Sequence, residues 1–334
     1  MWKMASWKLQ RLNKLALFYY FLNKCGRCML KRVISGFVAV AIAIVLVFYP
    51  SMYPLAFAMT IIAVGGVCEL FKGVEKIKIH PVRWLGISAV IVFMASAVMF
   101  SRGDEIAQIA NQISVNIQGF AHYTVIEDSI NIIPFFPLII TMLLLLGFIV
   151  EFFRDEKEPI KNIGATLFGA IYVGWLLCHV VMIKAFNKDL SVLSYTLSSG
   201  SCIIMLVFLC TWATDTFAFF VGRKFGKKKL SPKSSPNKTV EGALGGLIGS
   251  VIVGLCACCF IGIPWYHAFI LGFLFGIASQ LGDLTESAIK REIGIKDFGN
   301  IMPGHGGFLD RIDSMLFTAP LAYYYIIIFL PRFM

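Results

Sequence analysis

The sequence predicts an all-α, polytopic membrane protein. Of its 334 residues, 58% are hydrophobic and only 15% are charged, and the mean hydropathy is +0.79. About a quarter of the residues in a soluble domain are charged, so the composition excludes an ordinary soluble fold. The apolar residues gather in runs close to the ~20 residues that an α-helix needs to cross the hydrocarbon layer.

The apolar runs predict about nine transmembrane helices, and the last polar stretch separates the final two. The pair at 243–262 and 266–283 has a re-entrant hairpin as its alternative. All of 33–334 is expected to form a single transmembrane domain, because no polar stretch is long enough for a soluble one. The expected spans are 33–50, 53–71, 84–100, 132–152, 163–183, 201–222, 243–262, 266–283 and 314–331.

Residues 1–32 form a separate basic segment, with eight Lys and Arg and no acidic residue. Aromatic and leucine side chains alternate with the lysines. This pattern is typical of an amphipathic helix that lies on an anionic membrane surface. Cys25 and Cys28 within it have the spacing of half a zinc site and indicate no more than that.

The distribution of positive charge predicts the orientation. With the N-terminus in the cytoplasm, 26 of the 30 Lys and Arg residues fall in cytoplasmic segments, as the positive-inside rule requires. Loops 223–242 and 284–313 then share the cytoplasmic face, where nucleotides are found. Topology and anionic lipid account for the net charge of +11, which is therefore no evidence for nucleic-acid binding.

The first half of the polar stretch 280–314 continues a helix. Asp283, Ser287 and Arg291 are spaced by four and share one stripe of that helix. Glu286 and Lys290 share the adjoining stripe. Ion pairs at this spacing are common on solvated helices and contribute only a few tenths of a kcal/mol, so an ordinary charged face is the alternative to a binding site.

The second half of the stretch favours the binding site. A proline and three glycines stop the helix at 303–307, and a new helix follows whose first N–H groups suit a phosphate. Asp310 and Asp313 lie at its start. Together with Asp283 they offer the oxygen ligands that Mg²⁺ prefers beside substrate phosphates.

The spacing of these residues resembles the signature of the phosphatidate cytidylyltransferase (CDP-diacylglycerol synthase) family. The matching signature residues are Ser287-x-x-Lys290-Arg291, Lys296-Asp297 and Pro303-x-His305-Gly306-Gly307-x-x-Asp310-Arg311-x-Asp313. The preceding residues Gln280-x-Gly282-Asp283-x-x-Glu286-Ser287 fit the same family.

Two upstream motifs fit the same resemblance. Asp215 begins an aromatic stretch that runs into Gly-Arg, although Phe217 stands where the family pattern has Gly. An aspartate inside an apolar segment is by itself a functional candidate, with a structural ion pair as the alternative. Ser235-Pro-x-Lys238-Thr239-x-Glu-Gly resembles a second family motif, with Val240 in place of Trp.

The resemblance implies a bacterial inner-membrane enzyme, expected to be a homodimer, that uses CTP, phosphatidic acid and Mg²⁺, with a second cation as an option. It implies that Asp283, Asp310 and Asp313 hold the metal. It assigns phosphate contacts to three cationic side chains, those of Lys290, Arg291 and Arg311. It places seven other residues at the nucleotide or at the lipid phosphate: His305, Asp215, Lys238, Thr239, Ser287, Gly306 and Gly307.

Two other functions stay open at this point. Another CTP-using membrane transferase, such as a polyprenol kinase, would transfer the γ-phosphate. An ion-coupled transporter would also explain many spans and an intramembrane Asp215, but the charges gather in one loop and no broken helix pair repeats in the two halves. Glu69 is expected to snorkel to the membrane surface, with a polar pocket as the alternative.

Overall fold

The computed structural model describes residues 36–101, 135–155, 158–192, 195–299 and 306–333. The predicted N-terminal segment, most of the external loop and His305 lie outside this part of the chain. The described residues are overwhelmingly helical, and their strands form two short hairpins. The all-α membrane fold is therefore confirmed.

Six of the described helices are long and apolar enough to cross a membrane, and three shorter apolar helices accompany them. All nine coincide with predicted segments, while the number of actual crossings stays a prediction. The shorter helices are Gly36–Phe48, Arg83–Met99 and Phe136–Phe152. The labelled elements are α2 (Tyr53–Val74), α3 (Arg83–Phe100), α5 (Phe135–Phe152), α6 (Pro159–Gly169), a π-helical turn (Ala170–Trp175), α7 (Leu176–Lys184), α8 (Ser199–Phe225), α9 (Val240–Ile261), α10 (Trp265–Ile293) and α11 (Leu309–Phe329).

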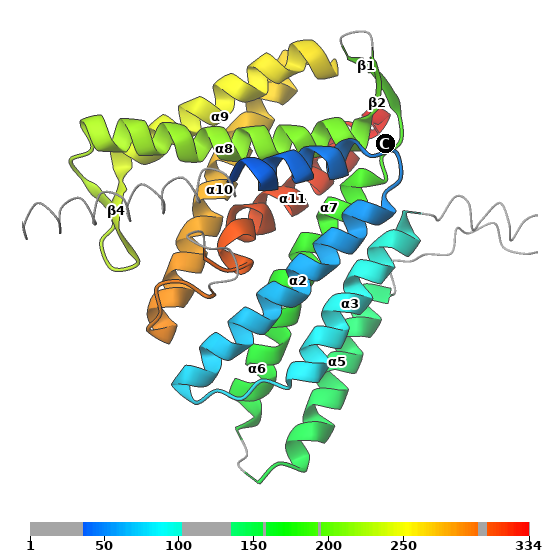
Figure 1. The fold of residues 1–334 in the computed structure, drawn as a ribbon, viewed down its shortest axis with the longest axis vertical. Coiled ribbons are helices and arrows are strands. Elements are labelled where there is room, and N and C mark those ends of the chain that lie inside the picture. Colours follow the sequence, from blue (N-terminus) through cyan, green and yellow to red (C-terminus); the bar gives the residue numbers. More distant parts are fainter. Residues whose placement is uncertain (1–35, 102–134, 156–157, 193–194, 300–305, 334) are drawn as a thin grey trace, which may run out of the picture.

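The helices form two groups that meet along α11 (Figure 1). Helices α2, α3, α5 and α6 pack as neighbours, and α8, α9 and α10 form the second group. Helix α11 contacts α2 and α7 on one side and α8 and α10 on the other. The polar end of α10 and the start of α11 therefore lie where the two groups meet.

Glycines let α8, α9 and α10 approach closely. A Cβ atom on Gly246 would lie 2.7 Å from the backbone oxygen of Thr214 on α8. The ring of Phe217, the residue that departs from the family pattern, occupies the space beside Gly249, where a Cβ would lie 2.6 Å from it. The glycine on α9 thus provides the room that Phe217 needs on α8.

The polar segments are bounded by clear capping signals. Helix α10 ends at Gly294, whose φ of 77° is in the left-handed region, and the Ile295 N–H donates to the Lys290 carbonyl at 2.9 Å. Thr239 caps α9 by accepting a hydrogen bond from the Gly242 N–H. Helix α10 thus runs about three turns past the end of the predicted span, and its charged residues stay helical.

Two hairpins were not predicted as strands. The first pairs β1 (Asp189–Val192) with β2 (Tyr195–Ser198), and the second pairs β3 (Lys229–Ser231) with β4 (Ser235–Thr239). The carboxylate of Glu241 accepts hydrogen bonds from the N–H groups of Lys227 and Lys228. This contact closes the basic loop onto the start of α9.

The close contact of α9 with α10 yields a stability prediction. A Cβ on Gly272 would lie 2.8 Å from the Ser250 carbonyl oxygen and 2.9 Å from the Val251 Cα. We expect Gly272→Ala to lower the unfolding free energy by about 1–3 kcal/mol, as overpacking does. Gly164→Ala is the matched control, since nothing lies within 4 Å of its added Cβ. Equal thermal midpoints in detergent for both variants would contradict this packing.

Candidate active site

The C-terminal half of α10 and the start of α11 bring three carboxylates together. One oxygen each from Asp283, Glu286 and Asp313 lie within 4.8 Å of one another. Asp283 and Glu286 are three apart on α10 and share a face, and Asp313 faces them from the second turn of α11. A Cβ on Gly282 would lie 3.0 Å from the Ser314 Cα, so this glycine allows α11 to come close enough for the cluster to form.

Lys290 joins this cluster to Asp310. Its ammonium lies 2.8 Å from a Glu286 oxygen and 3.0 Å from an Asp310 oxygen. All three side chains are largely buried. A buried charge is costly unless it is paired, so this lysine fixes α10 and α11 relative to each other. Glu286 lies in the interior with 1% of its surface exposed, so the alternative of an ordinary solvated charged face does not describe this part of α10.

Asp310 is engaged on both of its oxygens. One accepts from Lys290, and the other accepts from the Gly307 N–H at 2.7 Å and the Phe298 N–H at 3.2 Å. Its predicted role as a metal ligand stays a prediction, since the structure places Glu286 in the acidic cluster with Asp283 and Asp313. Gly306 has a φ of 87°, and a Cβ there would lie 3.1 Å from the Asp310 Cγ.

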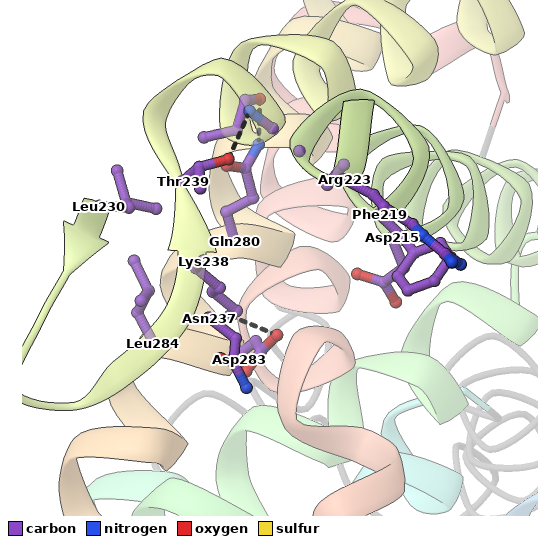
Figure 2. Close-up of a pocket in the computed structure, with 14 residues that line it drawn as sticks. Asp215, Phe219, Arg223, Leu230, Asn237, Lys238, Thr239, Gln280, Asp283 and Leu284 are labelled. Carbon is purple, nitrogen blue, oxygen red and sulfur yellow. Dashed lines mark hydrogen bonds and ion pairs between the residues drawn. The ribbon is translucent and has the colours of Figure 1, made fainter. Parts of the chain in front are cut away.

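A cavity of about 500 Å³ opens beside the acidic cluster (Figure 2). Lys238 reaches from β4 and forms an ion pair with Asp283. Figure 2 shows Asp215 and Arg223 of α8 on the opposite wall. The structure thus brings four of the predicted residues, Asp215, Lys238, Thr239 and Asp283, to one cavity. Its other lining residues include Phe219, Leu230, Asn237, Gln280 and Leu284.

The other predicted residues within the described part of the chain lie around this centre. The Ser287 hydroxyl donates to Asp283 at 3.3 Å. Exposed Arg291 donates to the Ser234 carbonyl at 3.2 Å and so connects α10 to the β3–β4 hairpin. Arg311 is exposed in the first turn of α11. Thr239 is buried as the cap of α9.

Glu69 does not snorkel, so that expectation was wrong. Its side chain is 5% exposed, and its carboxylate accepts a hydrogen bond from the Leu309 N–H at 3.0 Å. The alternative, a polar pocket, is what the structure shows. Hydropathy alone missed this because it does not reveal which segment packs against the end of α2.

Comparison with known proteins agrees with this geometry. The model of the "Cytidylyltransferase family" matches residues 30–329. The chain belongs to the cytidylyltransferase family.

Several relatives within this family carry the name phosphatidate cytidylyltransferase. A Synechocystis sp. protein is 38% identical over 54% of this chain and 67% of its own length. A Bacillus subtilis protein is 39% identical over 50% of this chain and 60% of its own. A Staphylococcus saprophyticus protein is 50% identical over 38% of this chain and 49% of its own. The matched regions thus span about half to two thirds of these relatives.

The position of Lys290 leads to a prediction about stability. We expect Lys290→Met to lower the unfolding free energy by about 3–5 kcal/mol, because Glu286 and Asp310 would stay buried without their cation. Lys188→Met changes an exposed lysine at the start of the β1–β2 hairpin and serves as the control. Chemical denaturation in detergent measures both. A Lys290→Met variant as stable as the control would show that the two carboxylates do not depend on this lysine.

Proposed function

We propose that this protein transfers the CMP group of CTP to phosphatidic acid, giving CDP-diacylglycerol and pyrophosphate. The observation that carries the proposal is the convergence of Asp283, Glu286 and Asp313 with Lys238 and Lys290 beside a cavity among membrane helices. The names of the family relatives support the same reaction. Converging anionic substrates require this kind of charged, oxygen-rich site.

The residues of the acidic cluster fit a divalent cation. Three carboxylates gather within 4.8 Å, and one oxygen of buried Glu286 has no hydrogen-bond partner among the described residues. Hard oxygen ligands suit Mg²⁺, so we assign Asp283, Glu286 and Asp313 as the side chains that would hold it. When bound, Mg²⁺ would neutralise phosphate charge.

The chain's own residues then position the substrates. Lys238 pairs with Asp283 in this structure and is free to exchange that partner for a substrate phosphate. Arg223 and Asp215 line the opposite wall. The apolar surface of Phe219, Leu230 and Leu284 suits a substrate that enters from the lipid. The phosphate oxygen of phosphatidic acid attacks the α-phosphorus of CTP, pyrophosphate leaves, and alignment of these groups is the main contribution of the protein.

The proposal also covers the location, orientation and oligomeric state of the protein. The chain is an integral, multi-pass membrane protein. A bacterial inner-membrane location, a cytoplasmic N-terminus and a homodimer are proposed from charge distribution and family resemblance. A cytoplasmic N-terminus places the 223–242 and 284–313 loops on the side that holds CTP. His305, Gly306, Gly307, Arg291 and Arg311 keep their proposed contacts with the nucleotide or with phosphate.

Isotope labelling tests the reaction. We expect purified protein with phosphatidic acid and Mg²⁺ to move label from α-³²P-CTP into lipid and to release label from γ-³²P-CTP as pyrophosphate. Entry of the γ label into lipid would contradict the proposal and indicate a kinase. Transport of a substrate without turnover of CTP would indicate a transporter.

The acidic cluster yields a second activity prediction. We expect Asp283→Asn to lower kcat by about a hundredfold or more, because electrostatic stabilisation of this size is lost when one such group is removed. Asp189→Asn changes an exposed carboxylate on β1 and is the control. The steady-state rate of CTP turnover is measured for both variants. A normal rate for Asp283→Asn would show that Asp283 is not part of the active site.

A further inference from the structure

One face of α2 supports the turn that leads into the active site. Gly65, Glu69 and Gly73 are spaced by four and therefore lie on one stripe of the helix. We call this stripe the α2 platform. It faces the end of α10, the start of α11 and the described parts of the connection between them, residues 294–299 and 306–308.

The two glycines of the platform make room for apolar side chains of the connection. A Cβ on Gly65 would lie 2.7 Å from a ring carbon of Phe308. A Cβ on Gly73 would lie 3.4 Å from Phe298 and 3.4 Å from Ile293. Both sides of the connection thus pack on the same stripe of α2, and Figure 1 shows α2 beside α11.

Glu69 lies between these two glycines and contacts the backbone of both sides. Its carboxylate accepts from the Leu309 N–H, the first residue of α11. A Cβ added to Gly299 or to Gly307 would lie 2.9 Å or 2.5 Å from the Glu69 Cδ. The second oxygen of Glu69 has no hydrogen-bond partner among the described residues. Burying a carboxylate oxygen without a hydrogen bond costs free energy. A glutamate here therefore needs a function beyond filling space in the interior.

These contacts continue to the acidic cluster. Gly307, which touches Glu69, donates its N–H to Asp310. Asp310 binds Lys290, and Lys290 binds Glu286 of the cluster. A shift of the connection on α2 would therefore move Asp310 and withdraw support from Lys290 and Glu286.

We propose that Glu69 is a positioning residue, which holds the described parts of the connection, at Gly299 and at 307–309, on the α2 platform and so sets the geometry of the acidic cluster. It touches no reacting atom in this account and acts through Gly307, Asp310 and Lys290. The effect on catalysis rests on the proposed function, while the effect on the connection does not.

Hydrogen exchange tests the position of the connection without any substrate. In Glu69→Ala, we expect amide exchange across 306–310 to rise at least tenfold, while the membrane helices keep their protection. Glu69→Gln keeps an acceptor for the Leu309 N–H and should show a smaller rise. Glu75→Gln, which changes a half-buried partner of Arg83 near the end of the same helix, is the matched control. Unchanged exchange across 306–310 in Glu69→Ala would overturn the proposal.

Kinetics of the same variants test the link to the cluster. We expect Glu69→Ala to lower kcat/KM for CTP by about a hundredfold, since misplacement of about 1 Å has effects of that size, and to raise the Mg²⁺ concentration for half-maximal activity. The KM for phosphatidic acid should not change. Activity that falls only in proportion to the folded fraction, with Mg²⁺ dependence unchanged, would overturn this role. If the wild type turns over no CTP, the proposed function fails, and the exchange result still decides whether Glu69 holds the connection.

Discussion

The site depends on Lys290, which pairs with Glu286 on its own helix and with Asp310 on the next. Buried carboxylates repel one another, and a single ammonium at 2.8 Å and 3.0 Å from two of them offsets part of that repulsion. Asp283 and Asp313 each place a carboxylate oxygen within 4.8 Å of a Glu286 oxygen. The cluster and its neighbours therefore hold more carboxylates than lysines, which suits a cation brought in with a phosphate substrate.

The rest of the fold holds this arrangement from three directions. Close packing of α9 on α8 and α10 forms one wall, and the β3–β4 hairpin brings Lys238 to Asp283. Helix α2 supports the connection from the opposite group of helices through Glu69. Arg291 joins the hairpin to the end of α10. The proposed substrate-binding groups thus come from distant parts of the chain and are held together by these contacts.

Most of the helices and part of the acidic cluster could be predicted from the sequence. The residues that were not predicted have a physical explanation. Hydropathy runs located the helices, because lipid and core both select apolar residues. The spacing of Asp283 and Asp313 within a family-like motif identified two members of the cluster. Glu286 was not predicted as a member of the cluster, since helical spacing cannot distinguish a solvated charged face from one that another helix covers. Glu69 was placed at the membrane surface for the same reason: its partner, Leu309, is 240 residues away.

We propose that Asp283, Glu286 and Asp313 form one divalent-cation site. The most direct measurement is anomalous scattering from crystals of the protein soaked with Mn²⁺, which replaces Mg²⁺ at oxygen-rich sites. We expect a strong anomalous peak within bonding distance of these three carboxylates and no such peak in crystals of Asp283→Asn. A peak bound elsewhere, or none at the cluster when Mn²⁺ supports turnover, would contradict it.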